Sequence, residues 1–592
     1  MNFLSRLFLL TYFLFIILNE KIYSQTNFSF FLTNTQPEFK VKTPAIQYEK
    51  QKSFESVNPI SRINSAFVQN RSYGTLGQVN TLSIDGGLSS HTKIGWNNTE
   101  INLPQNNTFD ISLLPLEFAT EYEIYRDNLS PYGINAQGGF INFLTGFPLQ
   151  KNGYLEFFKQ SYSTYGGKIL LKTQDENIKS IAGFSAIVSS NNFNYIDRYG
   201  FTNEAKNLDY TRYAIFSELY FPFASLSISH TYKNGGTGIS YNTSGRQKDF
   251  FTIFSLSSSL LNTDLKANYI NWQNTYTLTG YYEDTHINHS VNLEAKKDFE
   301  LFTLSNNFNP KVKLYWLEST KLLNHNSYET HLVYTLSKKI EMFSISYSSD
   351  LIYKDKLGFF YIPGLSGSFN IIEGINIYGS VSRGLLFPSF NDLYWPEDNF
   401  ARGDTNLKPE DGLRWQSGLA ALFPPFYINL SYSQSFIENQ IIWTPSSGKW
   451  QPENIGKVFS QIVNTIAKVE DQIGKIYYFF EVALSYNYSI NNDPDSKYYQ
   501  KRIIYSPLYK WTLKGNLEYK FISLNFSYRY ISERFTTEEN TVWLSPYKIL
   551  DIYLKIFWFY FGVENLLDES YEEIESYPQP GRIFKAGIKI EF

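Results

Sequence analysis

The chain ends in GRIFKAGIKIEF, residues Gly581 to Phe592. Apolar side chains alternate there with polar ones or glycine: Phe584, Ala586, Ile588, Ile590 and Phe592 against Lys585, Gly587, Lys589 and Glu591. This period of two predicts a β-strand with one apolar and one polar face. A terminal segment in solution is usually a solvated tail. A strand that runs to the last residue therefore predicts that this end is held inside a sheet.

The same alternation recurs from about Gly146 onward, in SLSISHTY (225–232), YINLSYS (427–433) and WTLKGNLEYKFISLNFSYRY (511–530). The polar faces carry full charges and need water, whereas the opposite faces are large and aromatic and must avoid it. A soluble sandwich or propeller would bury the apolar faces against one another. A transmembrane barrel would turn them towards lipid around a wet lumen.

The connections between these segments favour the barrel. Tight turns, as near Phe521, alternate with long polar stretches such as WPEDNFARGDTN (395–406) and NNDPDSKYYQKR (491–502). That asymmetry is typical of outer-membrane barrels, and closure pairs every backbone group that would otherwise face lipid. The sequence therefore predicts a mainly β protein built on an antiparallel transmembrane barrel.

Composition fits an exported membrane protein. Aromatic residues make up 18% of the chain, with 47 Tyr and 50 Phe. Tyr and Phe favour strands, and Tyr and Trp favour bilayer interfaces. A formal net charge of −4 argues against a nucleic-acid partner. The absence of cysteine excludes disulfides, thiolate metal sites and cysteine nucleophiles. Arg6 and the apolar run from Leu7 to Leu18 predict a signal peptide over residues 1–24, with an uncleaved anchor as the alternative.

Ahead of the barrel, short strands broken by Gly and Asn predict a small α+β domain. The stretch from Leu114 to Gly146 resembles the end of the plug domain of TonB-dependent outer-membrane receptors. The residues that carry this resemblance are Glu123, Ile124, Tyr132, Gly133, Ala136, Gly138, Gly139, Ile141, Asn142 and Thr145. The glycine pair predicts a close backbone approach or a positive φ.

Two further segments resemble the same family. The first is Ser382 to Asp411, and the second is the end of the chain. The terminal matches are Asn565, Leu566, Asp568, Tyr571, Pro580, Gly581, Arg582 and Phe592. The resemblance implies a 22-stranded antiparallel transmembrane β-barrel with an N-terminal α+β plug in its lumen. The expected divisions are a 25–50 extension, a 51–148 plug and a 149–592 barrel, whose aromatic last strand resembles the signal read by the barrel-assembly machinery.

The resemblance also implies a function. Such a receptor lies in the outer membrane of a Gram-negative-type bacterium and binds a scarce, bulky nutrient at the cell surface. The inner-membrane TonB-ExbB-ExbD complex then pulls on a segment called the TonB box. PEFKVKTPA is the candidate, through Glu38, Phe39, Val41, Thr43 and Ala45, with a plain linker as the alternative. No catalytic residue, metal or cofactor is expected, and a passive pore or adhesin is the competing hypothesis.

The segment SSHTKIGWNNTEINLPQ (89–105) resembles the small cobalamin-receptor branch, which favours a cobalamin-like ligand over a ferric siderophore. Residues expected near the ligand face are Ser89, Ser90, His91, Trp96, Asn97 and Asn98. Packing between plug and barrel is the other interpretation of His91 and Trp96. Asp85-Gly86 stands where the family has Arg-Gly, and that arginine normally anchors the plug, so plug packing is expected to be less secure.

Overall fold

A computed structural model describes residues 48–52, 60, 63, 65–75, 77–126, 128–129, 137–146, 152–175, 177–197, 199–238, 245–278, 280–446 and 448–592. All of them belong to one compact unit, Thr43–Phe592. The predicted signal peptide, the TonB-box candidate at 38–45, and Tyr132, Gly133 and Ala136 lie outside the described residues. No helix of the described part is long and apolar enough to cross a membrane.

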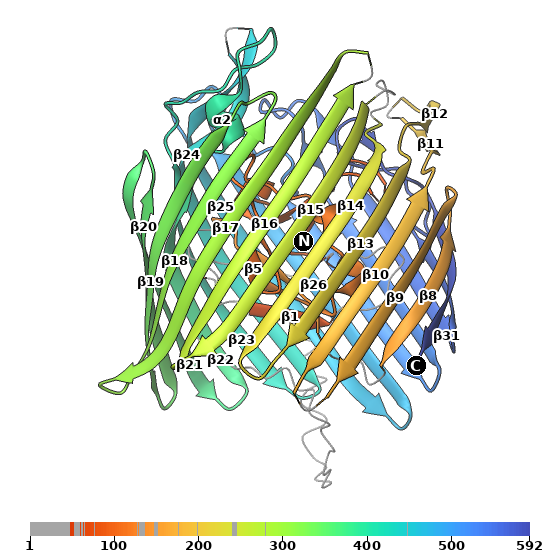
Figure 1. Cartoon of the computed structure of the whole chain (residues 1–592), viewed down its shortest axis with the longest axis horizontal. Helices are drawn as coiled ribbons and strands as arrows, with labels where there is room; N and C mark the ends of the chain where they lie inside the picture. The colour runs from red at the N-terminus through yellow and green to blue at the C-terminus, as the bar shows by residue number, and fades with distance from the viewer. Residues whose placement is uncertain are drawn as a thin grey trace, which may run out of the picture. The chain divides into compact units, whose positions relative to one another are not determined.

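The predicted 22-stranded antiparallel barrel is confirmed, with a folded plug inside it (Figure 1). Its strands are β8 (Gly153–Gln160), β9 (Thr164–Gln174), β10 (Lys179–Ser189), β13 (Tyr210–Tyr220), β14 (Ala224–Gly236), β15 (Gly245–Leu260), β16 (Thr263–Leu278), β17 (Tyr282–Leu301), β18 (Leu304–Ser319), β19 (His325–Ile340), β20 (Phe343–Lys354), β21 (Gly358–Ile372), β22 (Ile375–Leu386), β23 (Glu410–Phe423), β24 (Phe426–Ser446), β25 (Lys449–Ile473), β26 (Ile476–Asn491), β27 (Tyr509–Tyr519), β28 (Ile522–Ile531), β31 (Tyr547–Ile556), β32 (Phe559–Glu564) and β35 (Ile583–Glu591).

The last strand closes the cylinder. β35 pairs antiparallel with the first barrel strand, β8, from Lys585↔Gln160 to Glu591↔Tyr154. The backbone of Phe592 extends this pairing, because its N–H donates to the Gly153 carbonyl at 3.0 Å and its carbonyl accepts from the Gly153 N–H at 3.1 Å. The terminal residue is therefore a paired position of the sheet, as the alternation in the sequence predicted.

Burial along the wall is reversed relative to a soluble protein. On β35, the Phe584 side chain is 55% exposed on the outer face, whereas Lys585 on the inner face is only 7% exposed. Acidic groups on the inner wall, such as Asp249 and Asp350, are fully buried. An apolar exterior around a charged interior is the arrangement that lipid requires of a barrel.

The two ends of the barrel differ. One end carries short turns such as 261–262, 302–303 and 520–521, and we call it the turn end. The other carries long connections, and we call it the loop end. These connections are 190–209, 387–409, 492–508, 532–546 and 565–582. They hold the hairpins β11 (Phe193–Ile196) with β12 (Thr202–Ala205), β29 (Arg534–Phe535) with β30 (Trp543–Leu544), and β33 (Glu572–Ile574) with β34 (Tyr577–Pro578), and the helix α2 (Phe390–Tyr394).

The plug is built on a mixed sheet in the order β1-β6-β7-β4-β5. These strands are β1 (Tyr48–Lys52), β6 (Glu121–Tyr125), β7 (Phe140–Leu144), β4 (Lys93–Trp96) and β5 (Thr99–Glu100). The hairpin of β2 (Val68–Ser72) and β3 (Asn80–Ile84) and three 3-10 turns, η2 (Ser89–His91), η3 (Ile111–Leu113) and η4 (Leu116–Phe118), complete it. β1 starts three residues before the expected plug boundary at 51, because it pairs with β6 from Tyr48↔Tyr125.

Candidate functional site

The Gly-Gly motif joins two parts of the plug. Gly139 has φ 99°, and a Cβ there would overlap the Tyr125 carbonyl oxygen. A Cβ on Gly138 would lie 2.9 Å from the carbonyl oxygen of His91, which accepts the Gly138 N–H. Both reasons predicted for the glycine pair therefore apply here, and larger side chains cannot fit without moving the backbone.

Asn142 of the same motif lies fully buried on β7. Its amide donates to Asn98 at 2.8 Å and to the Glu123 carboxylate at 3.0 Å, and its oxygen accepts from the Asn98 N–H. It thereby ties β6 to the turn between β4 and β5. Gly138, Gly139 and Asn142 are thus structural residues of the plug.

Asp85 corrects the expectation of a less secure plug. Its carboxylate accepts from the Arg414 guanidinium of β23 at 2.5 Å and from the Asn464 amide of β25 at 2.9 Å. Side chains of the Asp85–Arg414 pair are 1% and 5% exposed. The family pattern has the arginine on the plug, whereas here the plug supplies the carboxylate and the barrel supplies the arginine. The anchor that the missing plug arginine seemed to remove is therefore present with opposite polarity.

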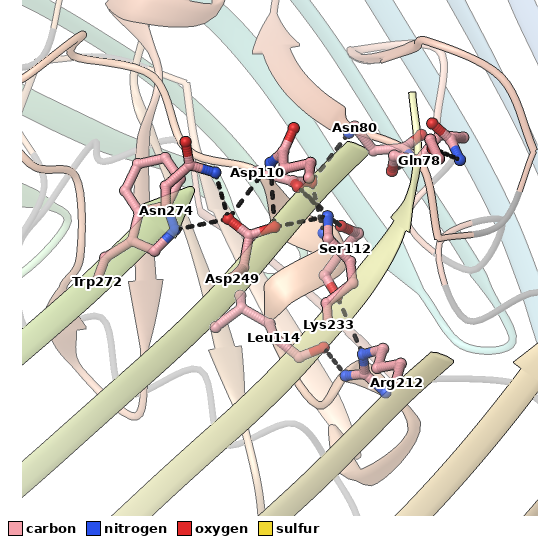
Figure 2. Close-up of polar contacts among 12 residues, drawn as sticks. Gln78, Asn80, Asp110, Ser112, Leu114, Arg212, Lys233, Asp249, Trp272 and Asn274 are labelled. Carbon is pink, nitrogen blue, oxygen red and sulfur yellow. Dashed lines mark hydrogen bonds and ion pairs between the residues drawn. The ribbon is translucent and has the colours of Figure 1, made fainter. Parts of the chain in front are cut away.

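A second anchor lies between the plug and strands β14 to β16 (Figure 2). The Lys233 ammonium of β14 donates to Asp110 of the plug at 2.7 Å and lies 3.7 Å from Asp249 of β15. Trp272 and Asn274 of β16 donate to Asp249 at 3.0 and 2.7 Å. Each charge is thus paired and hydrogen-bonded, which is the condition for a buried ion pair to be tolerated.

Arg212 of β13 extends this anchor along the wall. Its guanidinium donates to the Glu117 carboxylate at 2.7 Å and to the carbonyls of Ser112 and Leu114 at 3.1 and 2.7 Å. Burial disfavours the charged carboxyl, but Arg212 and Ser185 outweigh it and lower the pKa of Glu117. We call this group of contacts the latch, and its members are Arg212, Lys233 and Asp249 with their plug partners Asp110 and Glu117.

A cavity of about 160 Å³ lies at the loop end, between the plug, the wall strands β18, β19, β20 and β22 and the α2 segment. Its charged lining comes from Lys93, Glu100, Lys313, Glu329, Lys354, Asp355 and Lys356. Its aromatic lining comes from Tyr315, Phe387, Phe390 and Tyr394. Aromatic surfaces combined with a few convergent polar groups are the usual composition of a ligand site.

The charges in the cavity are organised around two carboxylates. Glu100 of the plug accepts from Lys313 at 2.8 Å and lies 3.3 Å from Lys93. Burial works against its ionisation, but these two lysines hold the pKa of Glu100 at about 2. Glu329 accepts from Lys354 at 2.9 Å, and the Lys354 ammonium also lies 5.6 Å from the Phe387 ring centroid. Each carboxylate thus fixes the position of a lysine at the cavity wall.

The α2 segment roofs this cavity and is fastened to the plug. The N–H groups of Phe390 and Asn391 donate to the carbonyls of Pro104 and Gln105 at 2.8 and 2.9 Å. Ser389 and Asp392 form a capping box that starts the helix. A long connection of the barrel and the tip of the plug therefore meet through backbone hydrogen bonds at one wall of the cavity.

Ser89, Ser90 and His91 form η2 near the loop end. The Ser89 hydroxyl lies 3.0 Å from that of Thr81, and Ser90 is half-buried. The His91 ring is buried and lies 2.8 Å from the Glu410 carboxylate at the start of β23. His91 thus makes a contact between plug and barrel, as the packing interpretation predicted. A ligand role for the two serines stays a prediction.

Trp96, Asn97 and Asn98 lie elsewhere than predicted. Trp96 is 3% exposed in the plug core. The carbonyls of Asn97 and Asn98 accept from Lys266, which is close to the turn end of β16, and the Asn97 amide donates to Glu218 near the turn end of β13. These positions face away from the loop end because the tight turn between β4 and β5 points to the opposite side. Their assignment to the ligand face is therefore corrected to a packing role.

The terminal motif folds the last long connection. Arg582 donates through its backbone N–H to Asp568 at 2.8 Å and through Nε to the Leu566 carbonyl at 3.0 Å. Asn565 accepts from the Glu569 N–H and donates to the Glu569 carbonyl. The Pro580-Gly581-Arg582 segment thus leads the chain into β35.

The cavity residues were missed from the sequence. The sequence singles out none of Lys313, Glu329 and Lys354, because every barrel strand shows the same alternation of polar and apolar residues. Lys93 and Glu100 lie inside the quoted plug segment 89–105, but nothing in their spacing distinguishes them. Only the closed sheet brings positions 93–107, 313–357 and 385–407 together.

A closed 22-stranded barrel with an ion-paired plug inside and a lined cavity at its loop end defines the class of plugged receptor barrels. The sequence profile of "TonB dependent receptor-like, beta-barrel" proteins matches residues 21–566. The chain therefore belongs to the TonB-dependent receptor family, as the resemblance in its motifs implied. This is a family of transporters and receptors rather than of enzymes.

Individual relatives are distant. The chain is 24% identical over 574 residues to the vitamin B12 transporter BtuB of Photobacterium profundum, covering 88% of this chain and 87% of that protein. Its fold is similar to that of the siderophore receptor PirA from Acinetobacter baumannii, with a TM-score of 0.73, 13% identity and coverage of 93% and 98%. The copper transporter OprC gives a TM-score of 0.75 at 10% identity, covering 93% and 98%.

Proposed function

We propose that this protein is an outer-membrane receptor that captures a scarce, bulky nutrient at its loop end and imports it into the periplasm. The cargo is cobalamin-like, with a ferric siderophore as the second candidate. Transport is driven by the TonB-ExbB-ExbD complex, which rearranges the plug. The corresponding division of the chain is a signal peptide (1–24), an extension with the TonB box (25–50, whose last three residues already belong to β1 of the plug), a plug (51–148) and a barrel (149–592).

The cavity beneath α2 carries this proposal. It is lined at once by the plug, the inner wall and a long connection, so a bound molecule would touch both the surface loops and the plug. A drug-sized ligand needs about 300–1,000 Å³, and this cavity holds about 160 Å³. A bulky cargo would therefore insert one polar flank between Lys313, Lys354 and the aromatic rings, with its remainder among the loops.

The anchors of the plug argue against the passive pore or adhesin. Asp85–Arg414 and Asp110–Lys233 hold the plug to separate parts of the wall through buried ion pairs. Removing one partner of such a pair leaves an uncompensated charge and costs about 3–5 kcal/mol. Thermal motion alone does not open several such contacts together, so an external energy source suits this barrel.

A cobalamin-like cargo is favoured by the similarity to the vitamin B12 transporter, which extends over most of both chains. The similarity to siderophore and copper transport proteins supports the fold alone. Uptake of radiolabelled cobalamin and of ferric siderophores in a deletion strain separates the two cargoes. The proposal fails if neither uptake depends on both this protein and TonB.

Lys354→Gln tests the cavity. The substitution keeps the approximate size of the side chain but removes the charge that Glu329 positions, and hydrogen bonds to charged groups contribute about 1.5–3 kcal/mol. We expect cargo affinity, measured on purified protein, to fall by about 10-fold or more. Lys168→Gln is the matched control, because Lys168 is similarly buried and 2.9 Å from Glu156 but lies outside the cavity lining. Equal loss in both variants would contradict the site.

Deletion of residues 38–45 tests the TonB box. The deletion should abolish uptake and preserve cargo binding at the cell surface, because an extended tether is needed only to engage the partner's sheet edge. Retained uptake would rule out this segment.

A further inference from the structure

The plug is held very differently on its two flanks. Along β13 to β16, the latch gives each buried charge an opposite partner, through Arg212, Lys233 and Asp249. Along β27 and β28, the plug presents β2, and Arg126, which follows β6, lies beside β2 over the Phe67 ring. We call this second contact, between β2 with Arg126 and the wall strands β27 and β28, the seam.

Polar atoms at the seam are buried without hydrogen-bond partners in the described part of the chain. On the plug side these atoms belong to Gln69, Asn70, Arg71 and Arg126. On the wall they belong to Thr512, Asn516 and Arg529. Thr512 and Arg529 are direct cross-strand neighbours on β27 and β28. Buried polar groups are normally paired with protein or ordered water, so this concentration marks a poorly sealed contact.

Three cations lie at the seam, and the carboxylates of Asp551 and Glu573 are among the charged neighbours of one of them, Arg529. Within the described ranges, Arg126, Lys510 and Arg529 form no ion pair. Arg126 lies over the Phe67 ring at 4.1 Å. Lys510 donates to the Val68 carbonyl, and the Arg529 guanidinium reaches the Tyr571 hydroxyl at 3.4 Å. The charged neighbours of Lys510 include three cations, Lys514, Arg529 and Arg534, and one carboxylate, Glu573.

A small cavity of about 40 Å³ opens at the loop-end margin of the seam. It is lined by Asn70, Arg529, Glu573 and Gln160, each of which contributes a buried atom without a partner among the described residues. About 10–15 Å³ of such volume is enough for one water molecule. The seam can therefore hold water, whereas the latch is closed by direct contacts.

We propose that the plug separates from the wall first at the seam, while the latch still holds, and that the cargo passes along the cationic face formed by Lys510, Thr512 and Arg529. This inference rests on the proposed transport function. It further assigns the chemistry of the passage: the Lys510 ammonium and the Arg529 guanidinium, which form no direct ion pair among the described residues, receive anionic oxygens of the cargo, whether from a phosphodiester or from a carboxylate. Among the described residues, separation there breaks the hydrogen bonds of Lys510 to the Val68 carbonyl and of Lys514 to the Tyr122 hydroxyl.

The chain contains no cysteine. A single introduced cysteine is therefore the only thiol of the protein that a maleimide can label, and its labelling rate reports how accessible that position is. Thr512→Cys probes the seam, and Thr231→Cys is the matched control on β14. Both threonines are 0% exposed, lie on the inner face of the wall and have an unpaired hydroxyl in the described structure. Cells receive cobalamin or a ferric siderophore together with a small charged maleimide, with and without an uncoupler. Uptake of the added cobalamin or siderophore is measured in the same samples.

We expect Thr512→Cys to be labelled at least 10-fold faster than Thr231→Cys in energised cells with cargo, and an uncoupler to abolish the difference. Equal labelling, faster labelling of Thr231→Cys, or no labelling despite uptake would overturn the inference while leaving the transport function intact. Absence of uptake for both cobalamin and siderophore would instead overturn the proposed function.

A second measurement does not depend on transport. In purified protein, the urea concentration at which each cysteine becomes reactive reports how firmly its flank of the plug is held. Thr512→Cys should react at a lower concentration than Thr231→Cys. Coincident urea midpoints would show that the plug is released as one body and would contradict the inference.

Discussion

At the scale of single residues, the plug depends on positions that tolerate one residue type. Gly139 combines a positive φ with a carbonyl oxygen where a Cβ would lie. Asp85 satisfies a buried arginine and a buried amide at once. Gly139 and Asp85 are both recognisable in the sequence as motif positions. Their partners, the Tyr125 carbonyl and Arg414, are recognisable only in the structure.

Gly139→Ala should disrupt the plug. A non-glycine residue at a disfavoured φ costs about 1–3 kcal/mol, and the clash with Tyr125 adds to this. Limited proteolysis of purified protein should release plug fragments at much lower protease concentration. Gly200→Ala is the control, since Gly200 has φ 87° but nothing within 4 Å of its Cβ position. A plug equally resistant in both variants would contradict the steric argument.

Asp85→Asn should cost about 3–5 kcal/mol, because it leaves the buried Arg414 charge without its partner. The double variant Asp85→Asn with Arg414→Gln should recover part of this loss, since it removes both charges. Denaturant titration of the wild type, the two single variants and the double variant measures the coupling. Simple addition of the two single effects would show that the pair does not anchor the plug.

At the scale of elements, the barrel is closed by a strand whose last residue is part of the ladder. Apolar positions of β35 face outward, and its lysines lie inside against aromatic rings, with Lys585 4.2 Å from the Phe158 ring centroid and Lys589 4.7 Å from that of Tyr154. This arrangement explains how a strand that meets lipid on one face can carry two lysines on the other.

Deleting Phe592 should impair closure, because it removes both backbone hydrogen bonds to Gly153. The folded, heat-modifiable fraction of the protein on gels should fall. Phe592→Ala keeps these backbone bonds and tests the side chain separately: slower appearance of folded barrel in cells, with normal stability once folded, would support its role as an assembly signal. A full folded yield from the deletion would contradict the closing role.

At the scale of the whole molecule, the plug is bound by electrostatic contacts that lie inside a membrane protein. Ion pairs fix it to β13, β14, β18 and β23, whereas the seam at β27 and β28 has buried polar atoms without partners in the described structure. Such a plug is held firmly when no force acts on it. Its contacts with the wall are stronger at the latch than at the seam, so the two sides should separate in sequence.

Acid should weaken the ion pair that Glu100 of the plug forms with Lys313 of β18. Its pKa is lowered from 4.5 to about 2, since Lys313 and Lys93 outweigh the effect of burial. A carboxyl with a lowered folded-state pKa stabilises the fold fully above its unfolded pKa and loses this contribution as the pH falls towards the folded value. Protease resistance of the plug should therefore decline between about pH 4.5 and 2. Glu100→Gln should show a smaller decline over this window, and identical profiles would contradict the assignment.

The sequence by itself determined the barrel, the plug and the family. Period-two alternation, the Gly138-Gly139 and Asn142 motif, and the terminal strand are local patterns, and local geometry fixes which face of a strand meets lipid. The particular contacts were decided only by the tertiary structure. Asp85 pairs with Arg414 on the wall, and the turn after Trp96 points away from the loop end. Lys313 and Lys354 line the same cavity. The physical reason is that closing the sheet brings together residues separated by hundreds of positions, and no local pattern records which of them will meet.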